Sequence, residues 1–400
     1  MYDVIVIGGG LAGLVSALEL TRSGWSVVLV ERKTYPFHKV CGEYVSNEVR
    51  PYIESLGVDL NGLGAVNINR FQFSSPSGRL LEATLDLGGF GISRYALDYA
   101  LYQLALEAGV TFRLGRQAES VTFQEDGFSV ALNDTETLHS RLVIGAFGKR
   151  SKLDRQMNRA FMQQPSPYIG VKYHIRAGLP DHGMPDHRVS ERGMLEHPFP
   201  TDVIALHNFP DGYCGMSAIE DDKYCLCYLT TRRNLRQFGN IADMERAILY
   251  QNPHLKRVFE TYEFLYDKPE VINEISFAPK KAVEDHILMA GDSAGLITPL
   301  CGNGMAMAIH GARLVSQVAN LFLNGQLSRP QLEAQYQTAW SGLFARRLWV
   351  GRNVQRLFGD AWLSEWAVTL IRTFPPLLQT IMRQTHGEVI AATPVSPLPS

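Results

Sequence analysis

The chain of 400 residues is long enough for one large domain or two interwoven domains, and it can bury a sizeable core. Hydrophobic residues make up 46% of it and charged residues 20%, a composition typical of globular proteins and far from disordered or fibrous ones. Its 38 basic and 40 acidic side chains leave a formal net charge of -2, which offers no overall field for a polyanion. We therefore expect no nucleic-acid partner.

Cysteine usage and apolar stretches give expectations about location. The five cysteines include no CxxC pair and have no metal-like spacing with the histidines, which favours a reducing cytoplasm and no metal site. A strand pattern starts at Tyr2, which leaves no room for an export signal. The most apolar later stretch, 362–382, is interrupted by charges and prolines, so we expect no transmembrane segment, while contact with a membrane surface is compatible with it.

The first thirty-odd residues predict a βαβ unit. Residues 3–7 form an apolar run typical of a buried parallel strand, 11–23 have helical spacing that ends at Gly24, and 26–30 give a second strand. Parallel strands joined by a crossover helix occur in sheets covered on both faces. The opening therefore predicts an open α/β fold of the Rossmann class.

A G-x-G-x-x-G motif lies between this first strand and the helix, which is the context that gives the motif meaning. Gly8 permits the tight turn, Gly10 lets the backbone approach a pyrophosphate, and Gly13 allows close packing of helix on strand. The first helical residues, Leu11 and Ala12, belong to a helix N-terminus that offers free N–H groups to phosphates. The alternative is a glycine cluster that only packs a helix; the context favours a dinucleotide site.

An acidic residue, Glu31, closes the second strand, where a carboxylate can bind both ribose hydroxyls. Followed by Arg32, it suits an unphosphorylated adenosine ribose and disfavours NADP as the ligand of this turn. FAD and NAD both fit the fingerprint. The choice between them depends on the far end of the chain.

The next segments alternate between two patterns. Residues 66–85 alternate with period two around a Ser-Pro-Ser-Gly turn and predict a β hairpin. A helix over 94–108, a hairpin over 120–132 that turns at Asp126-Gly127, and a strand over 142–145 return to the first pattern. We expect these segments beside the first sheet.

From 168 to 275 the pattern is mostly strand-like and alternating, which predicts a second, antiparallel sheet. Within it, 178–197 is rich in Pro, Gly, His and charge and is predicted to be a mobile loop. The chain ends in helices from about Gln331 onward.

Residues 287–308 contain a strand, a Gly-Asp turn, a glycine-punctuated loop and a helix that starts near Gly304. With the opening fingerprint, this segment resembles the flavoprotein superfamily of geranylgeranyl reductases, aromatic-ring hydroxylases and flavin-dependent halogenases, closest to the geranylgeranyl reductase-like branch. The resemblance spans about three-quarters of the chain, from Tyr2 to Asn320. It implies that FAD, bound non-covalently, is the cofactor, and that Asp292 after Gly291 contacts its ribityl or phosphate region.

The same resemblance implies that the loop of Pro299, Gly302, Asn303 and Gly304 runs beside the flavin ring. Independently of the family, a helix N-terminus aimed at the N1–C2=O edge stabilises the anionic reduced flavin, and glycines let the backbone reach it.

A further stretch, Lys39-Val-Cys-Gly-Glu43 with Ser46, is intermediate between the Lys-x-Cys-Gly-Gly of the reductases and the Gly-Glu-Ser of the halogenases. In the reductases this cysteine lies near the flavin, so Cys41 is a candidate cofactor contact and catalytic acid; the alternative is a small buried thiol. Cys41 and Cys301 could also approach each other in a redox role.

Three more side chains are candidates. Arg94, with Asp98 four residues later, resembles the family's helix-starting arginine that contacts the flavin phosphate or ribityl; the same spacing also makes a helix-surface ion pair. Lys172 and His174 alternate on one face of a predicted strand and could point into the substrate cavity as proton donors, although a lone histidine is more often structural.

Two departures limit what the family implies. Phe147 in Gly-Ala-Phe-Gly replaces the aspartate that ring hydroxylases using NAD(P)H carry, which puts the usual nucleotide contact in doubt, although NADH or NADPH stays a candidate electron donor. The Trp-x-Trp-x-Ile-Pro segment of the halogenases is absent, so we do not expect halogenation.

We therefore predict a glutathione reductase-like, Rossmann-type FAD-binding domain from residues 1–65, 91–165 and 276–325. An inserted antiparallel β-sheet domain for substrate comprises 66–90 and 166–275. Residues 326–400 form a C-terminal helical cap, or alternatively a lid for a lipid-like substrate or a membrane-resting surface.

The expected function is FAD-dependent reduction or dehydrogenation of a C=C bond in a small hydrophobic organic substrate, isoprenoid or polyketide-like, by hydride transfer through flavin N5. The alternatives are an FAD-dependent aromatic-ring monooxygenase and a non-catalytic flavin electron carrier. No residue pattern defines the substrate or an oligomeric state.

Overall fold

The computed structural model describes residues 1–177, 199–298, 302–357, 384 and 387–391. The predicted loop over 178–197, the flavin-side residues Pro299 and Cys301, and the apolar stretch 362–382 lie outside the described residues. Within the described residues, no helix combines the length and the apolar composition that a membrane span requires.

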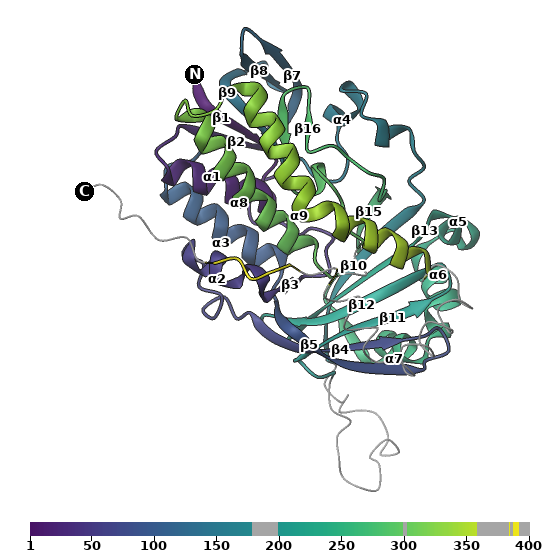
Figure 1. Cartoon of the computed structure of the whole chain (residues 1–400). Coiled ribbons are helices and arrows are strands. Elements are labelled where there is room, and N and C mark those ends of the chain that lie inside the picture. The colour runs from purple at the N-terminus through teal and green to yellow at the C-terminus, as the bar shows by residue number, and fades with distance from the viewer. Residues whose placement is uncertain (178–198, 299–301, 358–383, 385–386, 392–400) are drawn as a thin grey trace, which may run out of the picture.

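Two sheets organise the chain (Figure 1). The eight-stranded first sheet has the order β16-β17-β9-β1-β2-β6, with β8 beside β9 and β7 beside β8. Its strands are β1 (Tyr2–Ile7), β2 (Val27–Glu31), β6 (Thr111–Leu114), β7 (Ala118–Gln124), β8 (Gly127–Leu132), β9 (Thr137–Gly145), β16 (Val283–Glu284) and β17 (Ile287–Met289). β1 pairs parallel with both β2 and β9, as expected for a Rossmann-type core.

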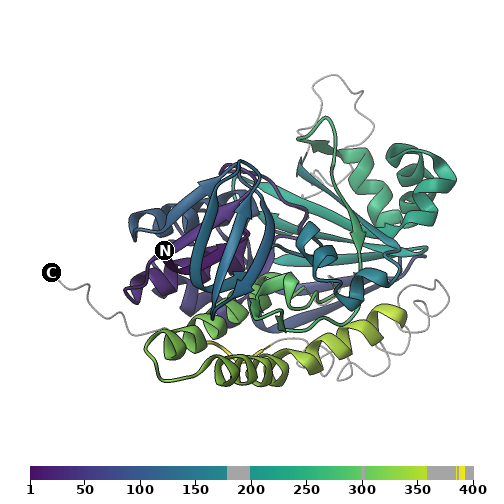
Figure 2. The ribbon, with the colours of Figure 1, turned by 90° about the horizontal axis from the view of Figure 1, so that it is seen from above.

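The first sheet forms because its central strands are apolar on both faces and helices cover one of them. β2 is buried throughout, and helix α1 (Leu11–Arg22) ends before Gly24, whose φ of +91° suits the chain reversal into β2. α1 packs against α3 (Arg94–Glu107) and α8 (Gly304–Leu323), and α8 packs against α9 (Arg329–Leu357). Figure 2 shows α8 and α9 running along one side of the molecule.

The nine-stranded second sheet has the order β14-β10-β13-β12-β11-β4-β5-β3, with β15 beside β10. Its strands are β3 (Tyr44–Ser46), β4 (Val66–Ser74), β5 (Leu80–Gly91), β10 (Tyr168–Ala177), β11 (Val203–Phe209), β12 (Gly212–Ile219), β13 (Lys223–Thr231), β14 (Tyr262–Phe264) and β15 (Glu270–Ile275). The sheet is antiparallel as predicted except between β4 and β11, which pair in parallel. Strands that are distant in the sequence can pair in either direction, because no tight turn joins them.

In the described part of the segment that the sequence pattern predicted to be mostly strands, three helices occur: α5 (Arg232–Phe238), α6 (Ile241–Ile248) and α7 (Pro253–Thr261). Each follows a side chain that caps its first turn, namely Thr231, Asn240 and Asn252. Their buried residues pack on Val171, Tyr173 and other side chains of one sheet face. The opposite face of the second sheet is left to line a cavity.

The remaining elements are short. They are α2 (Arg50–Ser55), α4 (Lys152–Gln156) and the 3-10 turns η1 (Asn47–Val49), η2 (Ala160–Gln163), η3 (Leu249–Gln251) and η4 (Gly291–Ser293).

Candidate cofactor and substrate site

A cavity of about 710 Å³ is lined by residues from both sheets. One end is formed by the glycine turn after β1, the end of β2 and the N-terminus of α8. The other end is formed by apolar side chains of the second sheet. The carboxyl ends of the parallel strands thus open onto it, which is the usual ligand position in open α/β sheets.

The three fingerprint glycines occupy different environments. A Cβ on Gly8, whose φ is +106°, would lie 2.3 Å from the carbonyl oxygen of Ala146, and one on Gly13 would lie 1.9 Å from the carbonyl oxygen of Gly8. A Cβ on Gly10 would meet no backbone within 4 Å; its nearest neighbours are Arg94 Nη2 at 3.6 Å and Lys39 Nζ at 3.7 Å. Gly10 therefore faces open space beside two cations, as a pyrophosphate site requires.

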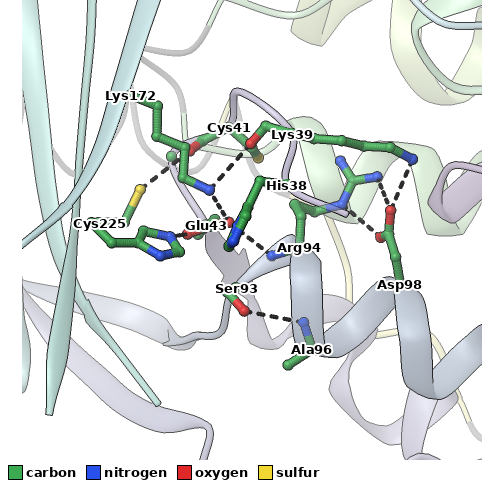
Figure 3. Close-up of polar contacts among 12 residues, drawn as sticks. His38, Lys39, Cys41, Glu43, Ser93, Arg94, Ala96, Asp98, Lys172 and Cys225 are labelled. Atoms are coloured by element: carbon green, nitrogen blue, oxygen red, sulfur yellow. Dashed lines mark hydrogen bonds and ion pairs between the residues drawn. The ribbon is translucent and has the colours of Figure 1, made fainter. Parts of the chain in front are cut away.

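These two cations share one buried carboxylate (Figure 3). Asp98 Oδ1 and Oδ2 each accept a hydrogen bond of 2.7 Å from Arg94, and Oδ2 accepts a third of 2.9 Å from Lys39. The sequence is compatible with two roles for Arg94, an ion pair or a cofactor contact; in the structure Arg94 forms the ion pair and also lines the cavity. Two cations on one carboxylate leave positive charge for an anionic ligand. Lys39 was not singled out as a cation from the sequence.

At the expected ribose end, Glu31 and Arg32 line the cavity, as do Leu11 and Ala12 at the start of α1. Its carboxylate accepts hydrogen bonds from Gly9 N at 2.7 Å and from Lys33 N at 3.0 Å. These bonds hold the carboxylate against the glycine turn.

At the opposite wall, Gly291 with φ +61° turns the chain into η4, and Asp292 lines the cavity. Burial raises the pKa of the Asp292 carboxyl, although Lys280, Arg94 and Lys149 oppose this shift. Gly302, Asn303 and Gly304 also line the cavity, where α8 begins, so the free N–H groups of this helix are at the wall.

Cys41 lines the cavity from the loop that joins β2 to β3. Burial raises the pKa of its thiol, while Arg94 acts in the opposite direction. The thiol is thus a neutral S–H group at neutral pH. Its predicted partner Cys301 lies outside the described residues.

Lys172 and His174 do not line the cavity. They are on the cavity-side face of β10, but the loop over 39–43 lies between them and the cavity, and both bind the Glu43 carboxylate. His174 Nε2 is 2.6 Å from Glu43 Oε2, and its Nδ1 is 2.7 Å from the Tyr266 hydroxyl. Glu43 was not a candidate, because nothing in the sequence connects it with a strand 130 residues later.

Glu43, His174 and Cys225 also bring a carboxylate oxygen, a ring nitrogen and a sulfur within 4.8 Å of one another, which is a spacing that metal ligands adopt. The ammonium of Lys172 already supplies a positive charge at this carboxylate. We therefore assign no metal to the cluster.

The apolar end of the cavity follows from the strand register. Phe73 on β4 is opposite Leu206 on β11, Leu206 is opposite Gly215 on β12, and Gly215 is opposite Cys227 on β13. Directly paired residues share a face of a sheet. We call this end the apolar chamber; it is lined by Phe71, Phe73, Leu81, Leu85, Ile204, Leu206, Tyr213, Gly215, Met216 and Leu229.

The residues present fit FAD. The glycine turn, Arg94 and Lys39 can take a pyrophosphate, Glu31 a ribose, and the α8 N-terminus the flavin ring edge. The apolar chamber then continues past the ring position.

Comparison with known proteins supports this assignment. Residues 1–173 match the model of the FAD binding domain family. Conditioned medium factor receptor 1 of Dictyostelium discoideum is 24% identical over 94% of this chain and 78% of its own length. Digeranylgeranylglycerophospholipid reductase of Methanococcus vannielii is 24% identical over 85% of this chain and 82% of its own. The solved structure of the flavin-dependent brominase Bmp2 has a TM-score of 0.74 at 18% identity, covering 96% of this chain and 93% of that chain.

The fold and the cavity thus define an FAD-binding protein of Rossmann type. Its first 173 residues match the FAD binding domain family, and the chain as a whole is similar to FAD-dependent reductases and halogenases; it is an FAD-dependent oxidoreductase with FAD as its cofactor. The predictions of fold class, superfamily and cofactor are confirmed.

Proposed function

We propose that this enzyme reduces a C=C bond of a hydrophobic organic substrate, such as an isoprenoid chain. The observation that carries the proposal is the apolar chamber, which is continuous with the cofactor groove and walled by Phe71, Phe73, Leu206 and their neighbours. A chamber of this kind desolvates an alkene, and the described side chains that we assign to its walls carry no charge.

When bound and reduced, FAD supplies the hydride. The reduction also needs a proton, and Cys41 is positioned to donate it, because its buried thiol is neutral and lies on the cavity wall. Donation leaves a thiolate beside Arg94, whose charge favours that form, and the thiolate regains its proton from solvent.

The name of the Methanococcus relative, a lipid reductase, agrees with this substrate class. Aromatic-ring monooxygenation remains the second candidate, because the same cavity could hold a flat ring. A pure electron carrier would keep the flavin edge exposed, which an apolar chamber beside it does not favour.

The test is to reduce the FAD-loaded protein without oxygen, add a prenyl lipid, and analyse the product by mass spectrometry. The proposal expects a product that gains two hydrogens, both replaced by deuterium when the flavin is reduced in D₂O, because the N5–H of reduced flavin exchanges with solvent. A product that instead gains an oxygen atom from labelled O₂, only in air, would support the monooxygenase. If neither product forms with any prenyl or aromatic substrate offered, the proposal is wrong.

A further inference from the structure

The loop over 39–43 lies across a polar patch on the second sheet (Figure 3). Lys172 Nζ donates to the carbonyl of Lys39 at 3.2 Å, and Cys225 Sγ donates to the carbonyl of Cys41 at 3.2 Å. Ser217 Oγ donates to the carbonyl of Gly42 at 3.3 Å. We call the four sheet side chains that bind this loop the socket; they are Lys172, His174, Ser217 and Cys225.

The socket is a product of cross-strand register. His174 on β10 is paired with Cys225 on β13, and Cys225 is paired with Ser217 on β12. Three strands thus present one row of polar groups on a face whose continuation is the apolar chamber. Each of these groups is buried, and each forms a hydrogen bond with the loop.

Glu43 is the charged centre of this contact. Its side chain is 0% exposed, and Oε1 accepts hydrogen bonds from Lys172 and from the backbone N–H of Arg94, the latter at 2.8 Å. Oε2 binds His174 at 2.6 Å. Burial alone would raise the pKa of Glu43, but Lys172 and His174 lower it to about 2, so the carboxylate stays ionised at any ordinary pH.

The backbone at Glu43 does not explain why a glutamate is present. Its φ of +54° lies in the left-handed region, where glycine is free of strain and a longer side chain is not. A buried ion pair is also weak evidence for stability, because desolvating both charges offsets their attraction. Neither the backbone conformation at Glu43 nor the stability of its ion pair therefore explains why a glutamate occupies this position.

We propose that Glu43 is a positioning residue, which locks the loop over 39–43 into the socket. It sets the place of the Cys41 thiol on the cavity wall, two residues before it. Through the Arg94 N–H it also ties the loop to the first turn of α3, the turn that carries the Arg94 guanidinium. One buried carboxylate thereby holds together both a candidate proton donor and a candidate phosphate ligand.

The first test measures release of the loop over 39–43 from the socket, and it does not depend on an enzymatic assay. FAD-saturated wild type, Glu43→Gln and Glu43→Gly are treated with iodoacetamide, and peptide mass spectrometry follows alkylation of Cys41 and Cys214 separately. Cys214 is fully buried on the other face of the sheet, so it reports global unfolding. Glu245→Gln is the matched control: Glu245 is also a buried carboxylate bound by β10 and β13 side chains, but on that other face.

We expect alkylation of Cys41 to be about tenfold faster in both Glu43 variants, with Cys214 still protected, because removing one partner exposes an uncompensated buried charge and frees the loop. Glu245→Gln should match wild type at Cys41. If Cys41 in Glu43→Gln reacts within about twofold of wild type, or if Cys214 accelerates equally, the positioning role is excluded.

The second readout rests on the proposed function. With a prenyl substrate, Glu43→Gln should lower kcat about tenfold or more while KM changes little, because the thiol is misplaced rather than the chamber. Unchanged kcat alongside faster alkylation would refute the catalytic consequence. If wild type itself turns over no alkene, the proposed function fails, while the alkylation result still decides whether Glu43 positions the loop.

Discussion

At the scale of single residues, the fingerprint glycines are required for two different reasons. Gly13 is needed by the protein itself, because the α1 helix touches the β1 turn there, whereas a side chain at Gly10 would meet no backbone, so we expect only the ligand to require that glycine. Substitutions at the two positions therefore test folding and cofactor binding separately, although both glycines belong to one sequence motif.

Gly13→Ala should destabilise the protein by about 3 kcal/mol, because its Cβ overlaps a backbone oxygen that cannot move freely. Gly10→Ala should leave the melting temperature of the FAD-free protein within error of wild type and weaken FAD binding about tenfold, measured by fluorescence titration. Gly342→Ala on the exposed face of α9 is the control and should be neutral or slightly stabilising. Equal FAD affinity in Gly10→Ala would contradict the pyrophosphate position.

A second residue-scale property is the buried Glu245, which accepts hydrogen bonds from Tyr173 and Tyr228. Burial raises its pKa to about 7. Because the folded protein holds this proton more tightly than the unfolded chain does, stability is greatest at low pH with respect to this group. It declines as pH rises from about 4.5 towards 7, and the loss is complete above that.

Glu245→Gln should therefore be more stable than wild type at pH 8, by about 3 kcal/mol at most, and equal to it near pH 4. An amide oxygen can still accept from both tyrosines. Urea unfolding at the two pH values measures the difference. A variant that is equally destabilised at both would show that Glu245 is ionised and needed as a carboxylate.

At the scale of elements, the α3 N-terminus and the loop over 39–43 are joined by one shared charge. Asp98 forms ion pairs with both Arg94 and Lys39, which come from these two elements. Burial alone would raise the pKa of Asp98, but the two cations lower it. The α3 N-terminus and the loop over 39–43 thus form a site with an excess of positive charge, which suits a phosphate.

Asp98→Asn should lower the stability of the FAD-free protein by about 3 kcal/mol, because two partly buried cations lose their buried counter-charge. Saturating FAD should restore much of this loss, since its phosphates supply negative charge at the same place, so the gap in Tm between variant and wild type narrows. Glu54→Gln removes an exposed i,i+4 pair with Arg50 and should cost less than about 0.5 kcal/mol. If FAD does not narrow the difference in Tm between Asp98→Asn and wild type, the phosphates bind elsewhere.

Most of the elements that could be predicted from the sequence are defined by local residue patterns. The apolar run of β1, the glycine turn and the Gly-Asp turn before η4 each depend on a few consecutive residues. The parallel pairing of β4 with β11 depends on tertiary assembly, which a local pattern does not contain. For the same reason Lys172 and His174 were recognised as candidates while their partner Glu43 was not. Helices α5 to α7 could have been found from their capping residues Thr231, Asn240 and Asn252.

At the scale of the whole molecule, the cavity belongs to neither sheet alone. The first sheet and α8 form the cofactor end, and the second sheet closes the chamber with the face that α5 to α7 leave uncovered. The row from Phe73 through Leu206 to Gly215 has one gap in side-chain volume, at the glycine. Substrate size should therefore be set there.

Gly215→Leu tests this arrangement. A Cβ at Gly215 would have its nearest neighbour, Cys227 O, at 3.7 Å, so Gly215→Ala should behave like wild type, whereas the leucine side chain must extend into the chamber. We expect Gly215→Leu to keep FAD affinity within about twofold and to raise KM for a prenyl substrate about tenfold, because steric filling removes ground-state and transition-state binding alike. Steady-state kinetics with prenyl chains of increasing length provide the measurement, and the penalty should grow with length. If Gly215→Leu instead weakens FAD and leaves KM unchanged, the chamber holds part of the cofactor and the substrate approaches from another side.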